Sequence, residues 1–383
     1  MSRFDQWIER RNTDSLKWSC AQNELPMWVA DMDFEAAPCI RQAILRRAER
    51  GVFGYSVIPD SWAKAYSDWW QARHNLQIER DELIFCTGVI PAISCLVKRL
   101  TNCGDKVICQ TPVYDIFFHS IENAGRTVLE SPLAYRDGKY AVDWEDLEEK
   151  LAHPLATLMI LCNPHNPVGK IWSKAELARL GDLCAKYGVT VISDEIHCDL
   201  TDIGAEYTPF AAASEVCAQN SVTCIAASKA FNMAGLQSAA VFTKNKRLWN
   251  IAYRGLNSDE IAEPNSFAVD ATVAAFTQGG EWLDELRAYL LQNKRYVADY
   301  LRENLPCLHL VEQNATYLLW VDCSAVTDDA EQLCIQIRQK TGLWITAGGQ
   351  YRGNGKQFVR INVACPLERV KDGMNRLKCG ISD

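Results

Sequence analysis

Three short polar segments of this chain each come directly after an apolar run, and each carries a residue type that can do chemistry. They are "CNPHNPVG" with Asn166, "SDEIHCD" with Asp194 and "AASKAFN" with Lys229. Short apolar runs of this kind are typical of buried strands. In open α/β sheets, ligands collect outside the carboxyl ends of the strands. We therefore expect these three side chains to converge on one site.

The three residue types match the needs of pyridoxal phosphate. This cofactor requires a lysine that bonds covalently to its aldehyde, a carboxylate that keeps its ring nitrogen protonated, and a donor to its phenolate oxygen. Lys229, Asp194 and Asn166 can fill these roles in that order. A charge-assisted bond between Asp194 and the ring nitrogen would favour the charged form of each partner. The sequence therefore predicts a pyridoxal-phosphate site.

Each of these residues has a simpler interpretation when it is taken alone. Asp194 after a strand is typical of a helix N-cap, and Asn166 between two prolines is typical of a turn. Lys229 could be an exposed lysine at a strand end. Because all three occur together in the pattern that one cofactor requires, we favour the cofactor interpretation.

The segments between the apolar runs indicate an α/β domain with a mostly parallel central sheet. Helix-like segments lie at 91–100 and 173–188, and the second opens with a capping-box pattern, Ser173 to Glu176. Alternation of strands and helices is the signature of such a sheet. The candidate strands are 106–110, 157–162, 189–193, 221–226 and 238–243.

The pattern changes after about residue 277. A long segment follows with apolar residues at a helical period, and then come strand-like runs at 316–323 and 357–365 around a helix-like segment at 328–341. This order predicts a smaller α+β unit. The predicted division is an N-terminal segment, 1–45, that packs with the small domain, a large cofactor-binding domain, 46–276, and a small C-terminal domain, 277–383.

Composition excludes several classes of function. The chain has 383 residues and a formal net charge of −8, so it lacks the basic footprint of a nucleic-acid-binding protein. We find no signal peptide and no apolar run long enough for a membrane helix. The 16 cysteines are scattered without a C-x-x-C pair, which disfavours zinc and predicts reduced thiols in the cytoplasm.

Longer stretches of the sequence resemble a known family nearly from end to end. The chain resembles fold-type I pyridoxal-phosphate enzymes of the class I/II aminotransferase superfamily, and within it the cystathionine β-lyase, or carbon–sulfur lyase, branch. This resemblance implies a three-layer α/β/α large domain and a smaller α+β domain. The stretches that carry it are "PMWVADMDF", "FGYS", "TGVIPAI", "TPVYDIFF", "NPHNPVG", "SDEIHCDL", "SKAFNMAGLQ", "TYLLWVD" and "FVRINVACP".

The resemblance implies roles for the residues that surround the cofactor ring. Lys229 would bond to the cofactor and then act as the proton-transfer base, and Asp194 would pair with the ring nitrogen. Asn166 would bond the ring hydroxyl, and Tyr114 would stack on the ring face as a second catalytic residue. Taken alone, Tyr114 is also typical of a packing aromatic.

Two further roles concern the phosphate and the substrate. The backbone of Gly88, Val89 and Ile90 would seat the phosphate at a helix start, with the Ser228 hydroxyl beside it. Arg360 would grip the substrate carboxylate in bidentate fashion, and Asn166 would also bind and orient the substrate. The alternatives are an ordinary turn glycine at 88 and a solvent-side strand residue at 360.

The resemblance also implies a homodimer with shared active sites. Tyr55, in "FGYS", is expected to reach the cofactor phosphate and the substrate of the partner subunit. A tyrosine in this position could equally be a packing aromatic of its own chain.

Two residues depart from the pattern of aminotransferases. His197 stands where many of them carry a tyrosine that bonds the ring hydroxyl, and it can contact the ring or lie behind it. Gln237 stands near the position of a phosphate-binding arginine. Both changes are compatible with the lyase branch.

The activity that the resemblance implies is α,β-elimination of L-cystathionine or another cysteine S-conjugate to a thiol, pyruvate and ammonia. A second possibility is an aminotransferase, because its ring-binding residues would be the same. A third is a regulatory binding protein that keeps the fold and the cofactor. The S-substituent that the site prefers does not follow from the sequence.

Overall fold

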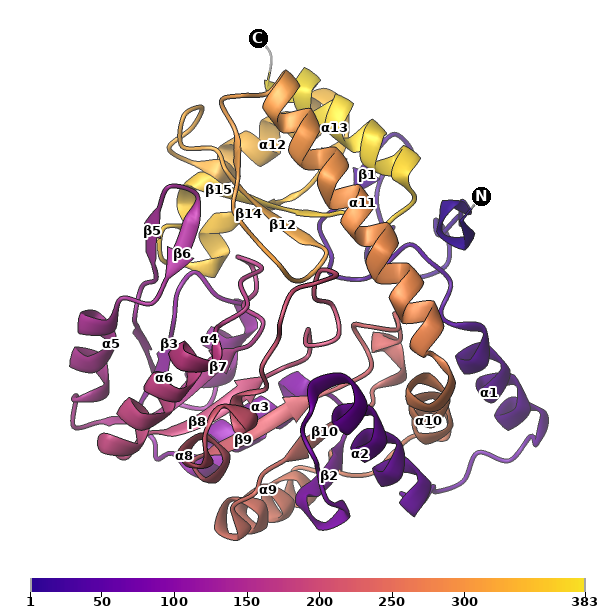
Figure 1. Ribbon diagram of the computed structural model, residues 1–383. Coiled ribbons are helices and arrows are strands. Elements are labelled where there is room, and N and C mark those ends of the chain that lie inside the picture. Colours follow the sequence, from indigo (N-terminus) through magenta and orange to yellow (C-terminus); the bar gives the residue numbers. More distant parts are fainter. Residues whose placement is uncertain (1, 382–383) are drawn as a thin grey trace.

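A seven-stranded sheet forms the centre of the computed structural model of the protein, which describes residues 2–381 (Figure 1). The strand order is β2-β10-β9-β8-β7-β3-β4. All neighbours from β9 to β4 pair in parallel, whereas β10 is antiparallel to both β2 and β9. The prediction of a mostly parallel sheet is therefore confirmed. The strands are β2 Leu83–Cys86, β3 Lys106–Cys109, β4 Thr127–Glu130, β7 Ala156–Cys162, β8 Thr190–Asp194, β9 Ser221–Ile225 and β10 Ala239–Phe242.

Helices cover both faces of this sheet because its strands are apolar on both sides. In β7, Leu158 and Ile160 belong to one core, while Met159 and Leu161 belong to another on the opposite face. The first core includes α3 (Val89–Leu100), α4 (Ile116–Glu122) and α9 (Lys246–Ser258). The second includes α5 (Trp144–Leu151), α6 (Lys174–Lys186), α7 (Phe210–Ala213) and α8 (Glu215–Gln219). The result is the expected three-layer arrangement.

Two of these helices can be compared closely with the sequence. Helix α6 begins after Ser173, whose side chain accepts from the Glu176 backbone while Glu176 bonds back, as the capping-box pattern predicts. Helix α3 starts at Val89, two residues before the predicted start at Pro91. A proline is tolerated in the first turn of a helix, because the N–H it lacks would have no partner within the helix.

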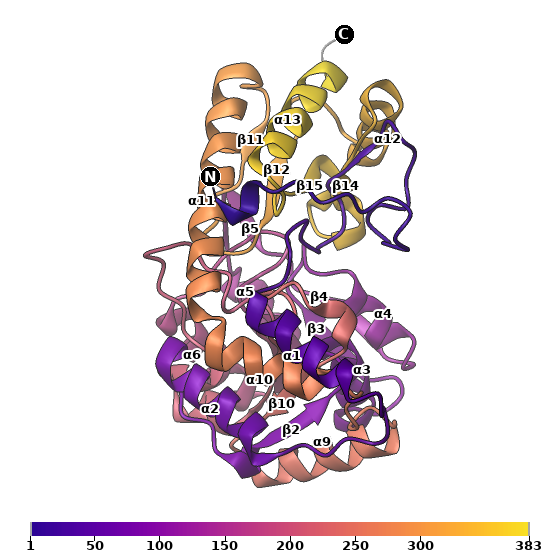
Figure 2. The ribbon, with the colours of Figure 1, turned by 90° about the vertical axis from the view of Figure 1, so that its right-hand side faces the viewer.

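A second, four-stranded antiparallel sheet is built from the C-terminal part of the chain, in the order β11-β12-β15-β14. Helix α11 (Gly280–Asn304) runs from this sheet toward the seven-stranded one (Figure 2). No helix in the described part of the chain is long and apolar enough to cross a membrane. The other elements here are β11 His309–Leu310, β12 Leu318–Asp322, α12 Ala330–Thr341, β13 Leu343–Trp344, β14 Thr346–Ala347, β15 Phe358–Asn362 and α13 Leu367–Ile381.

The remaining elements connect these parts. Helices α1 (Pro38–Glu49), α2 (Asp60–His74) and α10 (Ala268–Gln278) lie together near the β2 edge of the large sheet (Figure 1). Strands β5 (Ala134–Arg136) and β6 (Lys139–Ala141) form a hairpin. The short 3-10 helices are Arg3–Asp5, Arg80–Glu82, Ala234–Leu236, Gly348–Tyr351 and Gly355–Gln357. The predicted boundaries at 45/46 and 276/277 stay a prediction.

The N-terminal segment is bonded to both sheets. Strand β1 (Leu25–Pro26) pairs in parallel with β13, and the Asn362 side chain of β15 donates to the Asp31 carbonyl. On the other side, the Asn232 side chain donates to the carbonyls of Met32 and Phe34 at 3.1 and 2.9 Å. Residues 27–34 therefore form a strap between the two sheets.

One buried carboxylate holds the base of this strap. Asp33, 1% exposed, accepts from Lys17 Nζ at 3.0 Å and from Trp18 Nε1 and Arg10 Nη1 at 2.8 Å. Arg369 Nη1 of α13 lies 3.3 Å away. Burial by itself would raise the pKa of Asp33, but Lys17, Trp18 and Arg369 outweigh it and hold the pKa below its ordinary value. Asp33 thus joins the N-terminal segment to the C-terminal helix.

Replacing this carboxylate should destabilise the protein strongly. In Asp33→Asn the buried cations Lys17 and Arg369 lose their counter-charge, and we expect a loss of about 3–5 kcal/mol in the free energy of unfolding. The urea midpoint of the purified protein measures it. The matched control is Asp68→Asn, whose carboxylate is 60% exposed in its pair with Lys64 and should cost at most about 0.5 kcal/mol. Equal midpoints for the two variants would contradict the assignment.

Candidate active site

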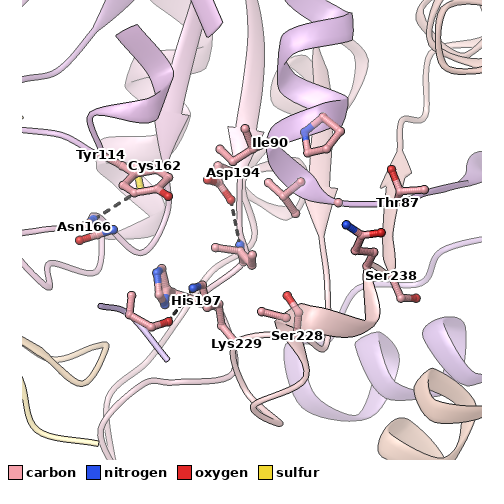
Figure 3. A pocket seen from close by; sticks show the side chains of 17 residues that line it. Thr87, Ile90, Tyr114, Cys162, Asn166, Asp194, His197, Ser228, Lys229 and Ser238 are labelled. Atoms are coloured by element: carbon pink, nitrogen blue, oxygen red, sulfur yellow. Dashed lines mark hydrogen bonds between the residues drawn. The ribbon is translucent and has the colours of Figure 1, made fainter. Parts of the chain in front are cut away.

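A cavity of about 280 Å³ opens at the carboxyl ends of β7, β8 and β9 (Figure 3). Its lining comes from several elements that lie far apart in the sequence. The predicted residues that line it are Gly88, Val89, Ile90, Tyr114, Asn166, Asp194, His197, Ser228 and Lys229. The structure therefore brings together nine of the residues that the sequence singled out.

Parallel pairing explains why the three strand-end segments meet. In the sheet Cys162 of β7 is the register partner of Asp194 in β8, and Asp194 is the partner of Cys224 in β9. Asn166 follows β7 by four positions, and Lys229 follows β9 by the same number. The three polar segments consequently leave the sheet at one edge.

Asp194 presents a buried carboxyl group to the cavity. Its side chain is 3% exposed and accepts from the Ile196 backbone at 3.1 Å. Burial raises its pKa to about 7, against the lowering effects of that bond and of Lys229. No cation in residues 2–381 lies within ion-pair distance of it. A protonated ring nitrogen would supply the missing positive charge and favour the ionised carboxylate.

Lys229 is half-buried and its amine is held near the strap. Nζ donates to the Ala30 carbonyl at 2.7 Å. Burial and then the Arg360 guanidinium lower the pKa of Lys229 to about 8, although Asp31 and Asp194 act in the opposite direction. A lysine with this pKa has a large neutral fraction near pH 8, and the neutral amine is the form that attacks an aldehyde.

His197 is a neutral side chain in the wall of the cavity. It is 3% exposed, and burial, Lys229 and Arg360 lower its pKa to about 3. Its Nδ1 atom is buried with no hydrogen-bond partner among the described residues. An unpartnered buried nitrogen is costly unless a bound group satisfies it, so this atom fits a cofactor in the cavity. Whether it contacts the ring stays a prediction.

Tyr114 and Asn166 lie together at one side of the cavity, opposite Thr87, Ser228 and Ser238 (Figure 3). The Asn166 backbone N–H donates to Cys162 Sγ at 3.4 Å, which holds the loop after β7 against the strand end. An aromatic ring and an amide on this side suit the ring of a planar cofactor. The stacking and hydroxyl-binding roles stay predictions.

The opposite side of the cavity suits an anion. Helix α3 begins there with Gly88 as its N-cap, and no side-chain cap covers its first turn. The first N–H groups of a helix have no partner within it, so they and the helix dipole favour a phosphate. Lys229 is the one cationic side chain among the residues that line the cavity, and Gln237 lines it as well.

Arg360 approaches the cavity from the second sheet. It lies on β15, is 6% exposed, and donates from Nη1 to Asn166 Oδ1 at 3.3 Å and from Nη2 to the Trp28 carbonyl at 3.2 Å. The solvent-side alternative is wrong, because all of β15 is buried between the cavity and its neighbouring strands. The hydrogen bonds of its guanidinium go to an amide oxygen and a backbone carbonyl, and its role toward a substrate carboxylate stays a prediction.

Tyr55 lies outside this cavity. It is in the loop between α1 and α2, and its side chain is fully exposed at 101%. The structure leaves its predicted role in a partner subunit as a prediction.

Sequence reasoning missed some of the lining. Ala30, Thr87 and Ser238 also face the cavity, as do Pro91, Cys162, Ile196 and Ala234. Ala30 lies within the stretch "PMWVADMDF", and Cys162 directly precedes "NPHNPVG". Their place in or beside stretches that the family resemblance rests on was therefore the only sequence signal that could have identified them. Their apolar or ordinary side chains carry no chemical signature of their own.

Comparisons with known proteins agree with this geometry. The family model of aminotransferase class I and II matches residues 24–377. Cystathionine beta-lyase PatB of Bacillus subtilis is 41% identical over 385 residues, which cover 99% of this chain and 100% of the relative. Protein MalY of Escherichia coli is 33% identical over 98% of this chain and 97% of its own length.

Solved structures with the same fold contain the predicted cofactor. Cystalysin from Treponema denticola, which contains pyridoxal 5'-phosphate, has a TM-score of 0.96 at 30% identity, over 99% of this chain and 98% of its own. The pyridoxal-phosphate-bound carbon–sulfur lyase of Staphylococcus hominis has a TM-score of 0.94 at 31% identity, over 100% and 99%. Pyridoxal phosphate is accordingly the cofactor that the residues of this cavity fit.

The lowered pKa of Lys229 predicts the pH dependence of cofactor capture. Apoprotein should incorporate pyridoxal phosphate faster as pH rises, with a midpoint near 8 rather than at the ordinary lysine value of 10.5, because the neutral fraction of the amine increases through its pKa. Borohydride trapping of the labelled Lys229 peptide over a pH series measures the rate. Lys229→Arg is the control that should take up no label. A midpoint near 10.5 would show that the amine is not desolvated.

Proposed function

Because the chain belongs to the aminotransferase class I and II family, we propose that it is a pyridoxal-phosphate-dependent carbon–sulfur β-lyase. The observation that carries this proposal is the full-length similarity to a cystathionine β-lyase, at 41% identity. The cavity supports it with a lysine of lowered pKa beside an unpaired buried carboxyl group. The reaction converts L-cystathionine and water to L-homocysteine, pyruvate and ammonia.

The bound cofactor supplies an electron sink at its protonated ring, which stabilises negative charge at the substrate Cα. Asp194 holds the proton on that ring. Lys229 Nζ accepts the proton from the substrate Cα, a task that its pKa of about 8 suits near neutral pH. The electron pair left at Cα then forms a Cα=Cβ double bond as the C–S bond breaks, and the C–S electron pair leaves with the sulfur as a thiolate. Water hydrolyses the released enamine to pyruvate and ammonia.

Arg360 and Asn166 orient the substrate. The guanidinium and the amide oxygen are already bonded to each other at 3.3 Å, so the Arg360 fork is fixed before a substrate carboxylate arrives. A thiolate is a good leaving group, and the main requirement is a fixed direction of the Cα–H bond. This is catalysis by orientation.

The homodimer is part of the proposal. Large side chains are exposed on the loop between α1 and α2, where Val52, Phe53 and Val57 are 73%, 56% and 81% exposed around Tyr55. A contiguous exposed apolar segment of this kind marks an interaction surface. We assign it to a second copy of the chain, into whose cavity Tyr55 reaches.

The 16 free cysteines support a cytoplasmic location.

The proposal predicts pyruvate release without a 2-oxo acid. Holoenzyme and L-cystathionine alone should give sustained pyruvate in a coupled assay. Lys229→Ala should lower the rate by at least about a hundredfold, because the group that accepts the Cα proton is lost. Turnover that requires an added 2-oxo acid would instead identify an aminotransferase.

Mixed dimers test the shared site. Tyr55→Ala and Lys229→Ala should each be nearly inactive alone. After the two variants are unfolded and refolded together in equal amounts, activity should return to about a quarter of wild type, because half the dimers are hybrids and each hybrid has one intact site of two. If hybrids form, as a tag on one variant can verify, but activity does not return, Tyr55 does not serve the partner's cavity.

A further inference from the structure

Asp115 is a carboxylate without an ion-pair partner in residues 2–381, next in the chain to a residue that lines the cavity. It directly follows Tyr114, which lines the cavity next to Asn166 (Figure 3). Asp115 precedes α4, but its side chain makes no capping bond to that helix. It has no ion-pair partner in residues 2–381. Neither helix capping nor a salt bridge therefore accounts for a half-buried aspartate at this position.

The surroundings of Asp115 contain further unsatisfied groups. The Val113 backbone donates to the Tyr351 carbonyl at 3.0 Å, which fixes Tyr351 beside this turn. The Arg360 Cζ atom lies 5.0 Å from the Tyr351 ring centroid. Both the Tyr351 hydroxyl and Arg360 Nε are buried without a hydrogen-bond partner in the described residues. Buried polar atoms left in this state indicate a place that a polar ligand completes.

The charges near Asp115 affect the pKa values of this residue and of Tyr114. Burial raises the pKa of the Asp115 carboxyl, while its own backbone N–H first, and then the charges of Arg360 and His119, act to lower it. After burial, the Asp115 charge is the largest effect that raises the pKa of Tyr114, which reaches about 12. Arg352, the other cation of this region, is already engaged with Glu122 at 2.7 Å and with Glu130 at 3.6 Å. It therefore does not neutralise Asp115.

A bound amino acid changes the balance of charge at this end. Under the proposed function, the substrate carboxylate takes the positive charge of Arg360. Asp115, which follows the cavity residue Tyr114 in the chain, is then left as a negative group with no counter-charge. A primary ammonium on the S-substituent complements it, whereas an alkyl group does not.

We infer that Asp115 is a specificity-determining residue that binds the ammonium group of the S-substituent. The substrate class is then cysteine S-conjugates whose sulfur carries an aminoalkyl group, of which L-cystathionine is one. This inference rests on the proposed function for its substrate orientation, and it adds the part of the substrate that the sequence left open.

Two nearly isosteric substrates test the inference with the holoenzyme. S-(2-aminoethyl)-L-cysteine ends in an ammonium where S-propyl-L-cysteine ends in a methyl group. Wild-type kcat/KM should favour the aminoethyl compound by at least about tenfold, the size of a hydrogen bond to a charged group. The difference should lie in KM, because the contact is equal in the bound substrate and in the transition state. In Asp115→Asn the preference should vanish, while the propyl compound should be turned over as in wild type.

The matched control is Glu122→Gln on the same helix. It removes one negative charge from α4 at a side chain that is 47% exposed and bonded to Arg352, and it should leave the preference intact. Melting temperatures of both variants establish that they fold. An equal loss for both substrates in Asp115→Asn would show that Asp115 only positions Arg360, and an unchanged preference would also overturn the inference.

A binding measurement separates this inference from the proposed function. Lys229→Ala loaded with cofactor should bind the aminoethyl compound more tightly than the propyl compound in calorimetry, and Asp115→Asn in that background should abolish the difference. If wild type releases no pyruvate from either compound but this difference is found, the lyase proposal fails and the Asp115 assignment stands. If both compounds yield pyruvate but bind equally tightly, the lyase proposal stands and the Asp115 assignment fails.

Discussion

Parallel pairing of β7, β8 and β9 is the constraint on which the rest of the site depends. Parallel strands end at the same edge of a sheet, and their register aligns Cys162, Asp194 and Cys224 across it. The segments that follow must leave the sheet together. Asn166, Asp194 and Lys229 therefore reach one cavity although they are separated by many residues in the chain.

Burial at that edge favours the neutral form of the ionisable side chains. It raises the pKa of Asp194 and lowers those of Lys229 and His197, so each group is driven toward its neutral form. The Arg360 charge adds to this effect on the lysine and the histidine. A cavity in which burial disfavours charge, and in which His197 Nδ1 has no hydrogen-bond partner among the described residues, suits a ligand that brings its own charges. The same desolvation lowers the pKa of Lys229 to about 8, as the proposed transfer of a proton near neutral pH requires.

The second sheet and the N-terminal strap complete the cavity from the other side. The strap supplies the Ala30 carbonyl to Lys229 and the Trp28 carbonyl to Arg360. It is itself held by Asn232 after β9 and by Asn362 on β15. Its base is fixed by the buried charges around Asp33, which join it to the C-terminal helix. The positions of Lys229 and Arg360 therefore depend on contacts between the N-terminal strap and the C-terminal helix.

The sequence by itself determined the features that local physics controls. Apolar runs followed by polar segments placed Asn166, Asp194 and Lys229 at strand ends, and the capping box placed the start of α6. The tertiary structure alone decided that β10 runs antiparallel, that Arg360 is buried against Asn166, and that Asp115 is left unpaired. Arg360 and Asn166 are 194 positions apart. Whether Asp115 has an ion-pair partner likewise depends on which cations the fold brings near it. Neither periodicity nor capping carries information about such distant pairs, because they form only when separate elements pack together.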